Sequence, residues 1–182
     1  MNENELQKLI AGCKSNRRSA QALLYKYFHD YGLSICLRYS ASREEAREIL
    51  DDGFMRVFTK IKDYPDNIHF KSWFRRILIN ISIDYFRKSQ RQVELTVMED
   101  ANDQTVEPAY YERLSYDQLI YFVEELSPTY RMVFSLYAIE GFSHEEISAA
   151  LGITESSSRS NLTRAKIRLQ EKIMIHLKTV NI

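Results

Sequence analysis

The chain has 182 residues, 45% of them apolar and 12% aromatic, which is enough for one large domain or two small ones with buried cores. Its 25 basic residues balance 25 acidic ones, and no apolar run approaches the roughly 20 residues that cross a bilayer. The N-terminal residues lack the basic-then-apolar pattern of a signal peptide, which predicts a cytoplasmic protein without membrane insertion.

The first 91 residues show helical periodicity with few interruptions, in a chain that has only five glycines and three prolines. Ser42 is a good N-cap, acidic residues follow it, and apolar residues from Leu50 to Ile61 recur at helical spacing. The Pro, Asp and Asn content of residues 63–69 predicts a loop. We therefore expect four helices, over residues 4–12, 17–39, 43–64 and 71–89.

The last of these helices is unusual, because apolar residues occupy most of its circumference. At about 100° per residue, one arc holds Trp73, Phe74, Ile77, Leu78, Ile81 and Tyr85, and a second patch holds Ile79, Ile83 and Phe86. Between them runs a polar strip of Arg76, Asn80, Asp84 and Arg87, with Trp73 at its edge. Arginine beside aromatic rings suits single-stranded nucleic acid. Apolar residues at helical spacing are more often core, so we keep only Trp73, Phe70 and His69 as candidates for contact with nucleic acid.

Charge is segregated along the chain although its sum is zero. Residues 71–91 carry six basic side chains and one acidic, residues 94–112 carry six acidic and no basic, and residues 155–172 carry five basic and two acidic. The acidic stretch has no helical period and contains Pro108, which predicts a linker. Two basic helices around an acidic segment favour nucleic-acid binding, which the net charge alone would argue against.

A second helical set follows the linker, with helices expected over residues 111–126, 128–139, 144–151 and 155–177. Ser127 and Pro128 are typical of an N-cap and the first helical position, and Ser143 with Glu146 is the pattern of a capping box. Gly152 suits the left-handed residue that ends a helix. A short helix, a Gly-containing turn and a longer helix predict a helix-turn-helix, whose second helix enters the DNA major groove.

The last helix has an apolar face and an opposite polar face. The apolar face, which we expect to pack on Ile147, Ala150 and Leu151, holds Leu162, Ala165, Leu169 and Ile173. The polar face holds Arg159, Ser160, Thr163 and Arg164, and the helix starts with the hydroxyls of Ser156, Ser157 and Ser158. Arginine bonds guanine bidentately, and hydroxyls reach bases or phosphates. An αα-hairpin with a solvated charged face is the alternative, but the capping box, the turn glycine and the clustered polar side chains favour DNA binding.

The sequence offers no constellation for catalysis. The two cysteines, Cys13 and Cys36, are far apart, and the four histidines have no zinc-ligand spacing. We find no nucleophile–base pair and no phosphate-binding loop, so we expect no enzymatic activity, no metal and no cofactor.

Three segments resemble a known family, the extracytoplasmic-function (ECF) group of bacterial RNA polymerase sigma factors. "AREILDDGFMRVFTKI" resembles the family's second-region helix that binds the clamp helices of the polymerase's largest subunit. "FKSWFRRILINISIDYFRK" is similar to the helix that opens and reads the minus-ten element. "LSPTYRMVFSLYAIEGFSHEEISAALGITESSSRSNLTRAKIRL" resembles the fourth region. The three segments have the family's order and spacing, which is more specific than one helix-turn-helix.

The resemblance implies an all-α fold of two small helical domains. A sigma region 2-like bundle over residues 1–91 would bind core polymerase and recognise and melt the minus-ten element. An acidic flexible linker over residues 92–112 would follow. A sigma region 4-like helix-turn-helix domain over residues 113–182 would recognise the minus-thirty-five element.

The family's site residues transfer by position. The polymerase-binding positions are Asp51, Asp52, Phe54 and Arg56. The positions that bind and melt the minus-ten element are Asp66, Asn67, Ile68, His69, Phe70, Trp73, Arg76 and Asn80. The positions that read the minus-thirty-five element are Ser157, Arg159, Ser160, Thr163 and Arg164. Two residues depart from the family: Asp51 stands where Gln is frequent, and Ser158 where a small apolar residue is usual.

The resemblance also implies the partners: the clamp helices of core RNA polymerase, the flap of its second-largest subunit, promoter DNA as duplex and as single strand, and an anti-sigma factor. Two alternatives stay open. A stand-alone helix-turn-helix regulator would be a dimer on a palindromic site, and an adaptor would bind polymerase without reading DNA.

Overall fold

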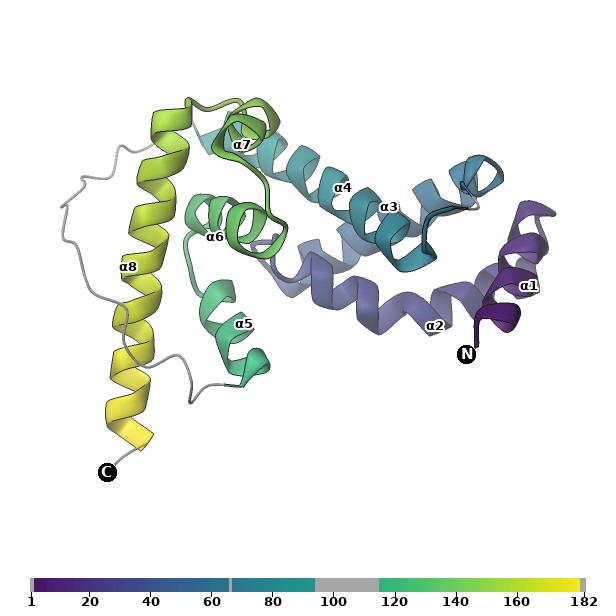
Figure 1. Ribbon diagram of the computed structural model, residues 1–182, viewed down its shortest axis with the longest axis horizontal. Coiled ribbons are helices and arrows are strands. Elements are labelled where there is room, and N and C mark those ends of the chain that lie inside the picture. Colours follow the sequence, from purple (N-terminus) through teal and green to yellow (C-terminus); the bar gives the residue numbers. More distant parts are fainter. Residues whose placement is uncertain (1, 66, 94–114, 181–182) are drawn as a thin grey trace. The chain divides into compact units, whose positions relative to one another are not determined.

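The computed structural model describes residues 2–65, 67–93 and 115–180, and within these ranges every regular element is a helix (Figure 1). The expected all-α fold is thus confirmed for the described residues. The chain divides into two compact units, Met1–Tyr85 and Phe86–Ile182. The expected domain boundaries at residues 91 and 112 stay a prediction, since residues 94–114 lie outside the described ranges. No helix in those ranges is long and apolar enough to cross a membrane.

The N-terminal unit contains α1 (Glu3–Lys14), α2 (Arg18–Cys36), α3 (Arg43–Lys60) and most of α4 (Phe70–Val93). The expected N-cap of α3 is confirmed, because the Ser42 hydroxyl accepts a hydrogen bond from the Glu45 N–H at 3.1 Å. We expected this helix to run to residue 64, but a 3₁₀ turn, Ile61–Asp63, follows Lys60. Pro65 explains the early end, because a proline disfavours helical geometry at the residue before it, and Tyr64 is extended.

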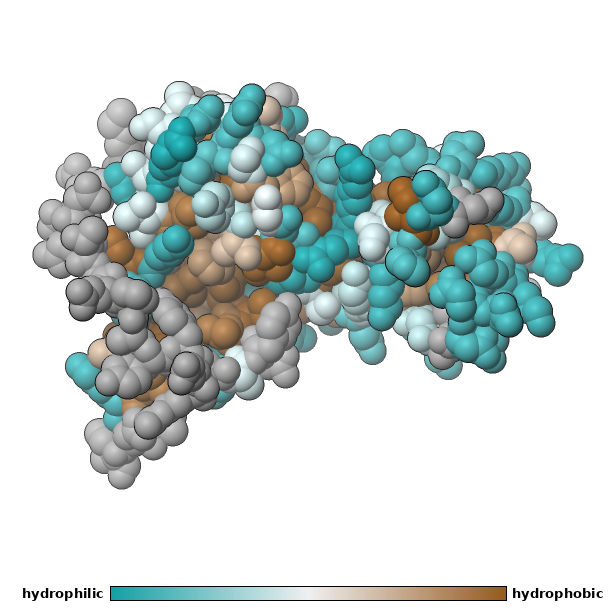
Figure 2. All heavy atoms as spheres, viewed as in Figure 1, coloured by the Kyte–Doolittle hydropathy of each residue, from teal (hydrophilic) through white to brown (hydrophobic). Residues whose placement is uncertain are grey.

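The core of this unit is aromatic. Phe28, Phe54, Phe70 and Phe74 are all at most 2% exposed. Their ring centroids lie 4.7 Å apart for Phe28 and Phe70 and 4.8 Å apart for Phe54 and Phe74. The rings thereby join α2, α3 and the first turns of α4. Hydrophilic side chains cover much of the face of this unit that Figure 2 shows.

The C-terminal unit contains α5 (Tyr116–Glu124), α6 (Pro128–Phe134), a π-helical turn (Ser135–Ile139), α7 (His144–Leu151) and α8 (Glu155–Val180). α7 has the expected bounds, and its capping box of Ser143 and Glu146 is confirmed. The helix expected over residues 128–139 changes to a π-helical turn after Phe134. Ser127 occupies the N-cap position of α6 as expected, although its side chain makes no capping hydrogen bond.

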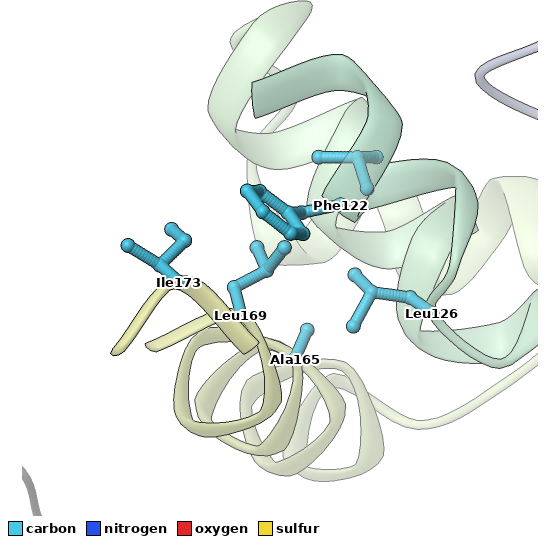
Figure 3. Packing of buried hydrophobic residues seen from close by; sticks show 6 residues of the cluster. Phe122, Leu126, Ala165, Leu169 and Ile173 are labelled. Carbon is cyan, nitrogen blue, oxygen red and sulfur yellow. The ribbon is translucent and has the colours of Figure 1, made fainter. Parts of the chain in front are cut away.

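The apolar face of α8 packs on α5 and α6 as well as on α7. Phe122 and Val123 of α5, with Leu126 just after this helix, form one buried cluster with Ala165, Leu169 and Ile173 of α8 (Figure 3). Ile147 and Leu151 of α7 are buried as expected, but Ala150 is only half-buried. The expected partner surface was therefore incomplete. Helical spacing identified the buried face of α8, but it could not identify all the helices that cover that face.

Candidate functional site

The loop before α4 presents polar and apolar side chains to solvent. Asn67, Ile68 and His69 are exposed, and Asp66 lies outside the described residues. The Tyr64 hydroxyl donates to the Ile68 carbonyl, and the His69 carbonyl accepts from the Trp73 N–H at 3.1 Å. These bonds hold the loop across the start of α4.

Phe70 was expected to contact nucleic acid, but the structure buries it. Its side chain is 2% exposed and lies against Phe28, so it supports the loop from below. Trp73 is half-buried, with its ring centroid 5.0 Å from that of Tyr64 and 5.8 Å from that of Phe70. Trp73 therefore stands at the boundary between the core and solvent, as helical spacing indicated.

The polar strip along α4 has the expected exposure. Arg76, Asn80 and Asp84 are exposed, and Arg87 is half-buried. The apolar residues on both sides of the strip are covered: Phe74 and Leu78 on one side are 0% exposed, and Ile79 and Ile83 on the other are 5% and 7% exposed. The strip thus leads away from Trp73 and the loop, and offers a guanidinium and an amide within two turns of the indole ring. Such a surface can stack on bases and bind phosphates.

The α3 residues with an expected polymerase role fall into two groups. Asp51, Asp52 and Arg56 are exposed, whereas Phe54 is 2% exposed and belongs to the core. Met55, which we had not singled out, is 66% exposed. Met55 follows Asp51 by four residues and Asp52 by three, and residues with this spacing share one face of a helix. The spacing could therefore have identified Met55 as part of the same surface.

Both carboxylates on this face are bonded to tyrosines of neighbouring helices. Tyr85 of α4 donates to Asp52 Oδ2 at 2.7 Å, and Tyr25 of α2 donates to Asp51 Oδ1 at 3.2 Å. The hydrogen bond to Asp52, with burial and the charges of nearby carboxylates, raises the pKa of Tyr85 to about 12. Sequence reasoning missed both pairs, because their members lie far apart along the chain.

In the C-terminal unit, the turn between α7 and α8 has the expected geometry. Gly152 has φ +71°, the left-handed value that favours glycine, and its N–H donates to the Ser148 carbonyl. The Thr154 hydroxyl accepts from the Ser157 N–H at 3.0 Å and so caps the start of α8. We had not predicted this cap. A threonine directly before the expected start of the helix could have indicated it.

The expected base-reading face of α8 is accessible. Ser157, Arg159, Ser160 and Thr163 are exposed, and Arg164 is half-buried. Arg159 is not isolated, because its guanidinium forms an ion pair with Glu155 one turn earlier. The pair is exposed, so exchanging Glu155 for another acceptor costs little.

Ser158 points into the unit and is 0% exposed. Its hydroxyl lies 2.9 Å from Nδ1 of His144, the first residue of α7, and the His144 ring stacks on Tyr137 with centroids 4.6 Å apart. Burial lowers the pKa of His144, and the nearby charge of Arg159 lowers it further. Ser158, which stands where the family usually has a small apolar residue, thus has His144 as a hydrogen-bonding partner.

The described residues hold no group of three or more His, Cys, Asp or Glu placed to bind a metal ion. Cys13 and Cys36 are both buried, and burial raises their thiol pKa values to about 11 and about 12. Thiols in that state are largely protonated at neutral pH and therefore poorly nucleophilic.

Two family models match the chain in succession. Sigma-70 region 2 matches residues 24–92, and Sigma-70 region 4 matches residues 116–169. The first match includes α3, the loop and α4, and the second includes the helix-turn-helix up to Leu169 of α8.

Individual relatives agree with these models. The chain is similar to the ECF RNA polymerase sigma factor SigE of Mycolicibacterium smegmatis, with 29% identity over 78% of this chain and 57% of SigE. It is also similar to the ECF RNA polymerase sigma factor SigM of Bacillus subtilis, with 26% identity over 81% of this chain and 91% of SigM. The match therefore spans little more than half the length of the first relative and most of the second.

Two solved structures align over most of the chain. One is CnrH in complex with the cytosolic domain of CnrY, with 20% identity, coverage of 92% of this chain and 96% of that one, and a TM-score of 0.47. The other is the sigma factor RpoE in complex with the anti-sigma factor NepR from Bartonella quintana, with 22% identity, coverage of 95% and 96%, and a TM-score of 0.45. Both scores are low, so the family assignment rests on the sequence comparisons.

Proposed function

The chain belongs to the ECF group of bacterial RNA polymerase sigma factors, and we propose from this that it binds core RNA polymerase and directs the enzyme to specific promoters. The observation that carries the proposal is the order of the two family matches, region 2 at residues 24–92 and region 4 at residues 116–169. We propose domain limits of residues 1–91 and 113–182, joined by an acidic linker over residues 92–112.

Core polymerase would dock on the exposed face of α3. Asp51, Asp52 and Arg56 supply charges on that face, and Met55 supplies an apolar contact among them. Phe54 acts from the core, where its ring holds α3 against Phe74 of α4. The clamp helices of the largest subunit are the proposed partner surface, with the flap of the second-largest subunit as partner of the C-terminal unit.

Promoter melting would depend on the loop before α4 and on the polar strip. Asn67, Ile68 and His69 would surround an unstacked base of the minus-ten element, with Trp73 beside them and Phe70 supporting them from the core. Arg76 and Asn80 would follow the single strand. Contacts to unstacked bases offset the cost of extracting them, a few kcal/mol per base. Asp66 belongs to the same proposed loop but lies outside the described residues.

The minus-thirty-five element would be read as duplex by α8. Its N-terminal half presents Arg159, Ser160 and Thr163 to solvent, with Arg164 beside them and Ser157 at the helix start. On binding DNA, Arg159 would release Glu155 and bond a guanine instead. It would then replace one charge-assisted bond with a bidentate pair of bonds to the base.

The function requires binding but no covalent step. Sigma factors as a class act by binding polymerase and DNA, and we propose the same for this chain, without enzymatic activity or a cofactor. Because RNA polymerase acts in the cytoplasm, we propose that location. The resemblance to the ECF group implies an anti-sigma factor as partner, and we propose that one controls this chain.

A stand-alone helix-turn-helix regulator is not favoured, because the match to region 2 includes most of the N-terminal unit. Transcription in vitro separates these possibilities. The full chain would be mixed with core polymerase and supercoiled genomic promoters, and the transcripts sequenced. We expect initiation at a defined set of start sites that depends on the chain. Absence of specific initiation would contradict the sigma-factor function, and binding of a dimer to a palindrome without polymerase would support the regulator instead.

A further inference from the structure

The exposed face of α3 carries two adjacent carboxylates, each bonded to a tyrosine of a different neighbouring helix. Tyr25 reaches Asp51 from α2, and Tyr85 reaches Asp52 from α4. Asp51 and Asp52 are exposed, and the two tyrosines are half-buried. Each phenol ring is therefore anchored by the protein, while the carboxylate it bonds faces solvent.

The two hydrogen bonds differ in length, and the difference decides which of them can orient its carboxylate. An O–H···O⁻ bond is strong at about 2.5–2.7 Å. The Tyr85–Asp52 distance of 2.7 Å lies at this limit, whereas the Tyr25–Asp51 distance of 3.2 Å is longer and indicates a weak bond. For Tyr85, the bond to Asp52 is also the largest cause of its raised pKa, whereas for Tyr25 burial is the largest cause.

Tyr85 bonds only one of the two oxygens of Asp52. The hydrogen bond to Oδ2 selects one orientation of the carboxylate, and the second oxygen can still accept a bond from a cationic partner. A side chain that is already ordered loses less conformational entropy when a partner binds than one that turns freely. The difference is about 0.5–1.5 kcal/mol for each immobilised side chain, which corresponds to roughly twofold to tenfold in affinity.

We propose that Tyr85 is a positioning residue for the binding of core RNA polymerase, acting through the carboxylate of Asp52. The proposal rests on the proposed function, in which polymerase docks on α3. It adds a residue on α4, the helix that also carries the polar strip, to the determinants of holoenzyme assembly. Tyr85 itself would not touch the polymerase.

The test measures the Kd of the labelled full-length chain for core polymerase by fluorescence anisotropy. Tyr85→Phe removes the hydroxyl but keeps the ring, and Asp52→Ala removes the carboxylate. The two changes are then combined. Tyr25→Phe tests the longer bond, and Tyr27→Phe is a matched control at a tyrosine of α2 that is 48% exposed. Asp52→Glu keeps the charge but lengthens the side chain by one methylene group, which displaces the carboxylate from its position beside Tyr85. This variant tests the positioning of the carboxylate if Tyr85→Phe does not fold.

We expect Tyr85→Phe to weaken binding roughly twofold to tenfold, and Asp52→Glu to weaken it to a similar extent. Tyr25→Phe should have a smaller effect and Tyr27→Phe none. In the Asp52→Ala background, Tyr85→Phe should cause no further loss, because the carboxylate it orients is gone. A purely structural role would lower the melting temperature of Tyr85→Phe and leave the Kd unchanged.

Two outcomes would overturn the proposal, and they are distinguishable. If Asp52→Ala weakens binding while Tyr85→Phe does not, or if the two effects add in full, Tyr85 does not position Asp52. If Asp52→Ala itself leaves the Kd unchanged, the docking role of Asp52 in the proposed function is wrong, and the role of Tyr85 fails with it.

Discussion

A single buried hydroxyl, that of Ser158, joins the two helices of the helix-turn-helix. Its Oγ lies 2.9 Å from Nδ1 of His144, and the residue is 0% exposed. We expect Ser158→Ala to lower the free energy of unfolding by about 1 kcal/mol relative to Ser160→Ala. Both changes replace a helical serine by alanine, so the gain in helix propensity cancels in the comparison. Urea unfolding followed by circular dichroism measures the difference, and equal stability of the two variants would show that the hydrogen bond contributes nothing.

The same pair makes stability depend on pH. Burial and the charge of Arg159 lower the pKa of His144, with Lys166 acting in the same direction and Glu155 in the opposite one. In the window between this lowered pKa and the ordinary value near 6.5, the unfolded chain binds more protons than the folded one. The stability conferred by neutral His144 is therefore complete above about pH 6.5 and is lost as the pH falls through that window.

Calorimetric melting of the full chain between about pH 7.5 and about pH 5 measures this dependence, because the range brackets the ordinary pKa of histidine. His144→Asn supplies a comparison, because an amide can still bond Ser158 but does not titrate. We expect the fall in melting temperature on acidification to be shallower in the variant. An identical fall in both proteins would assign the pH dependence to other groups.

Residue-level expectations were confirmed where helical geometry alone decides them. The exposure of Arg76 and Asn80 follows from their spacing along one helix. Phe54 and Phe70 are buried, which was not expected, because a family resemblance identifies the helix that carries a function but not the direction of each side chain. The bond between Tyr85 and Asp52 could not be predicted, since its members are 33 residues apart and meet only after two helices pack.

Among the helices, α3 and α4 approach closely because α3 carries a glycine at the contact. A Cβ atom at Gly53 would stand 2.3 Å from Leu78 Cδ2, and Leu78 is 0% exposed. Alanine at this position gains about 1 kcal/mol of helix propensity, but overpacking a filled core costs about 1–3 kcal/mol. We expect Gly53→Ala to be destabilising on balance. Urea unfolding followed by Trp73 fluorescence reports on this unit, because Trp73 is the only tryptophan of the chain and lies on α4, the helix that carries Leu78.

The combined change Gly53→Ala and Leu78→Ala tests the cause of the destabilisation. Removing the Leu78 methyl groups makes room for the new Cβ, so the double variant should be more stable than the sum of the two single effects implies. If the effects of the two single changes on the free energy of unfolding simply add, the contact with Leu78 is not the cause of the destabilisation by Gly53→Ala.

Helix boundaries were predictable where the sequence contains a capping residue or a residue that ends helices. α7 begins after Ser143 and ends before Gly152 as expected, because the capping box and the left-handed glycine act locally. α3 ends earlier than expected because periodicity continues through Ile61, while Pro65 determines the geometry of Tyr64. The π-helical turn after Phe134 had no signal in the spacing of apolar residues.

At the scale of the whole molecule, the two units have complementary chemistry. The N-terminal unit offers a loop, an indole ring and a polar strip, which suit unpaired bases, and the C-terminal unit offers an exposed helix face, which suits a major groove. The segregated charge of the sequence predicted two basic helices that bind nucleic acid, but not which form of nucleic acid suits each helix. The packing of α5 against α8, which supports the exposed face of α8, could be seen only in the structure, because their cluster joins residues about 40 apart or more.

If the two units act at different steps, changes in each should affect different measurements. Arg159→Ala should weaken binding of the holoenzyme to duplex promoters by about 1–3 kcal/mol, the value of one bidentate base contact. Trp73→Ala should leave that binding nearly unchanged but reduce the permanganate reactivity of thymines in the melted region, since a base–aromatic stack contributes about 1–3 kcal/mol. A promoter carrying a premelted bubble should restore transcription by Trp73→Ala and not by Arg159→Ala, because the bubble supplies the open strand and not the upstream contact. Equal losses at both steps in both variants, with no rescue by the bubble, would contradict the separation of recognition and melting between the two units.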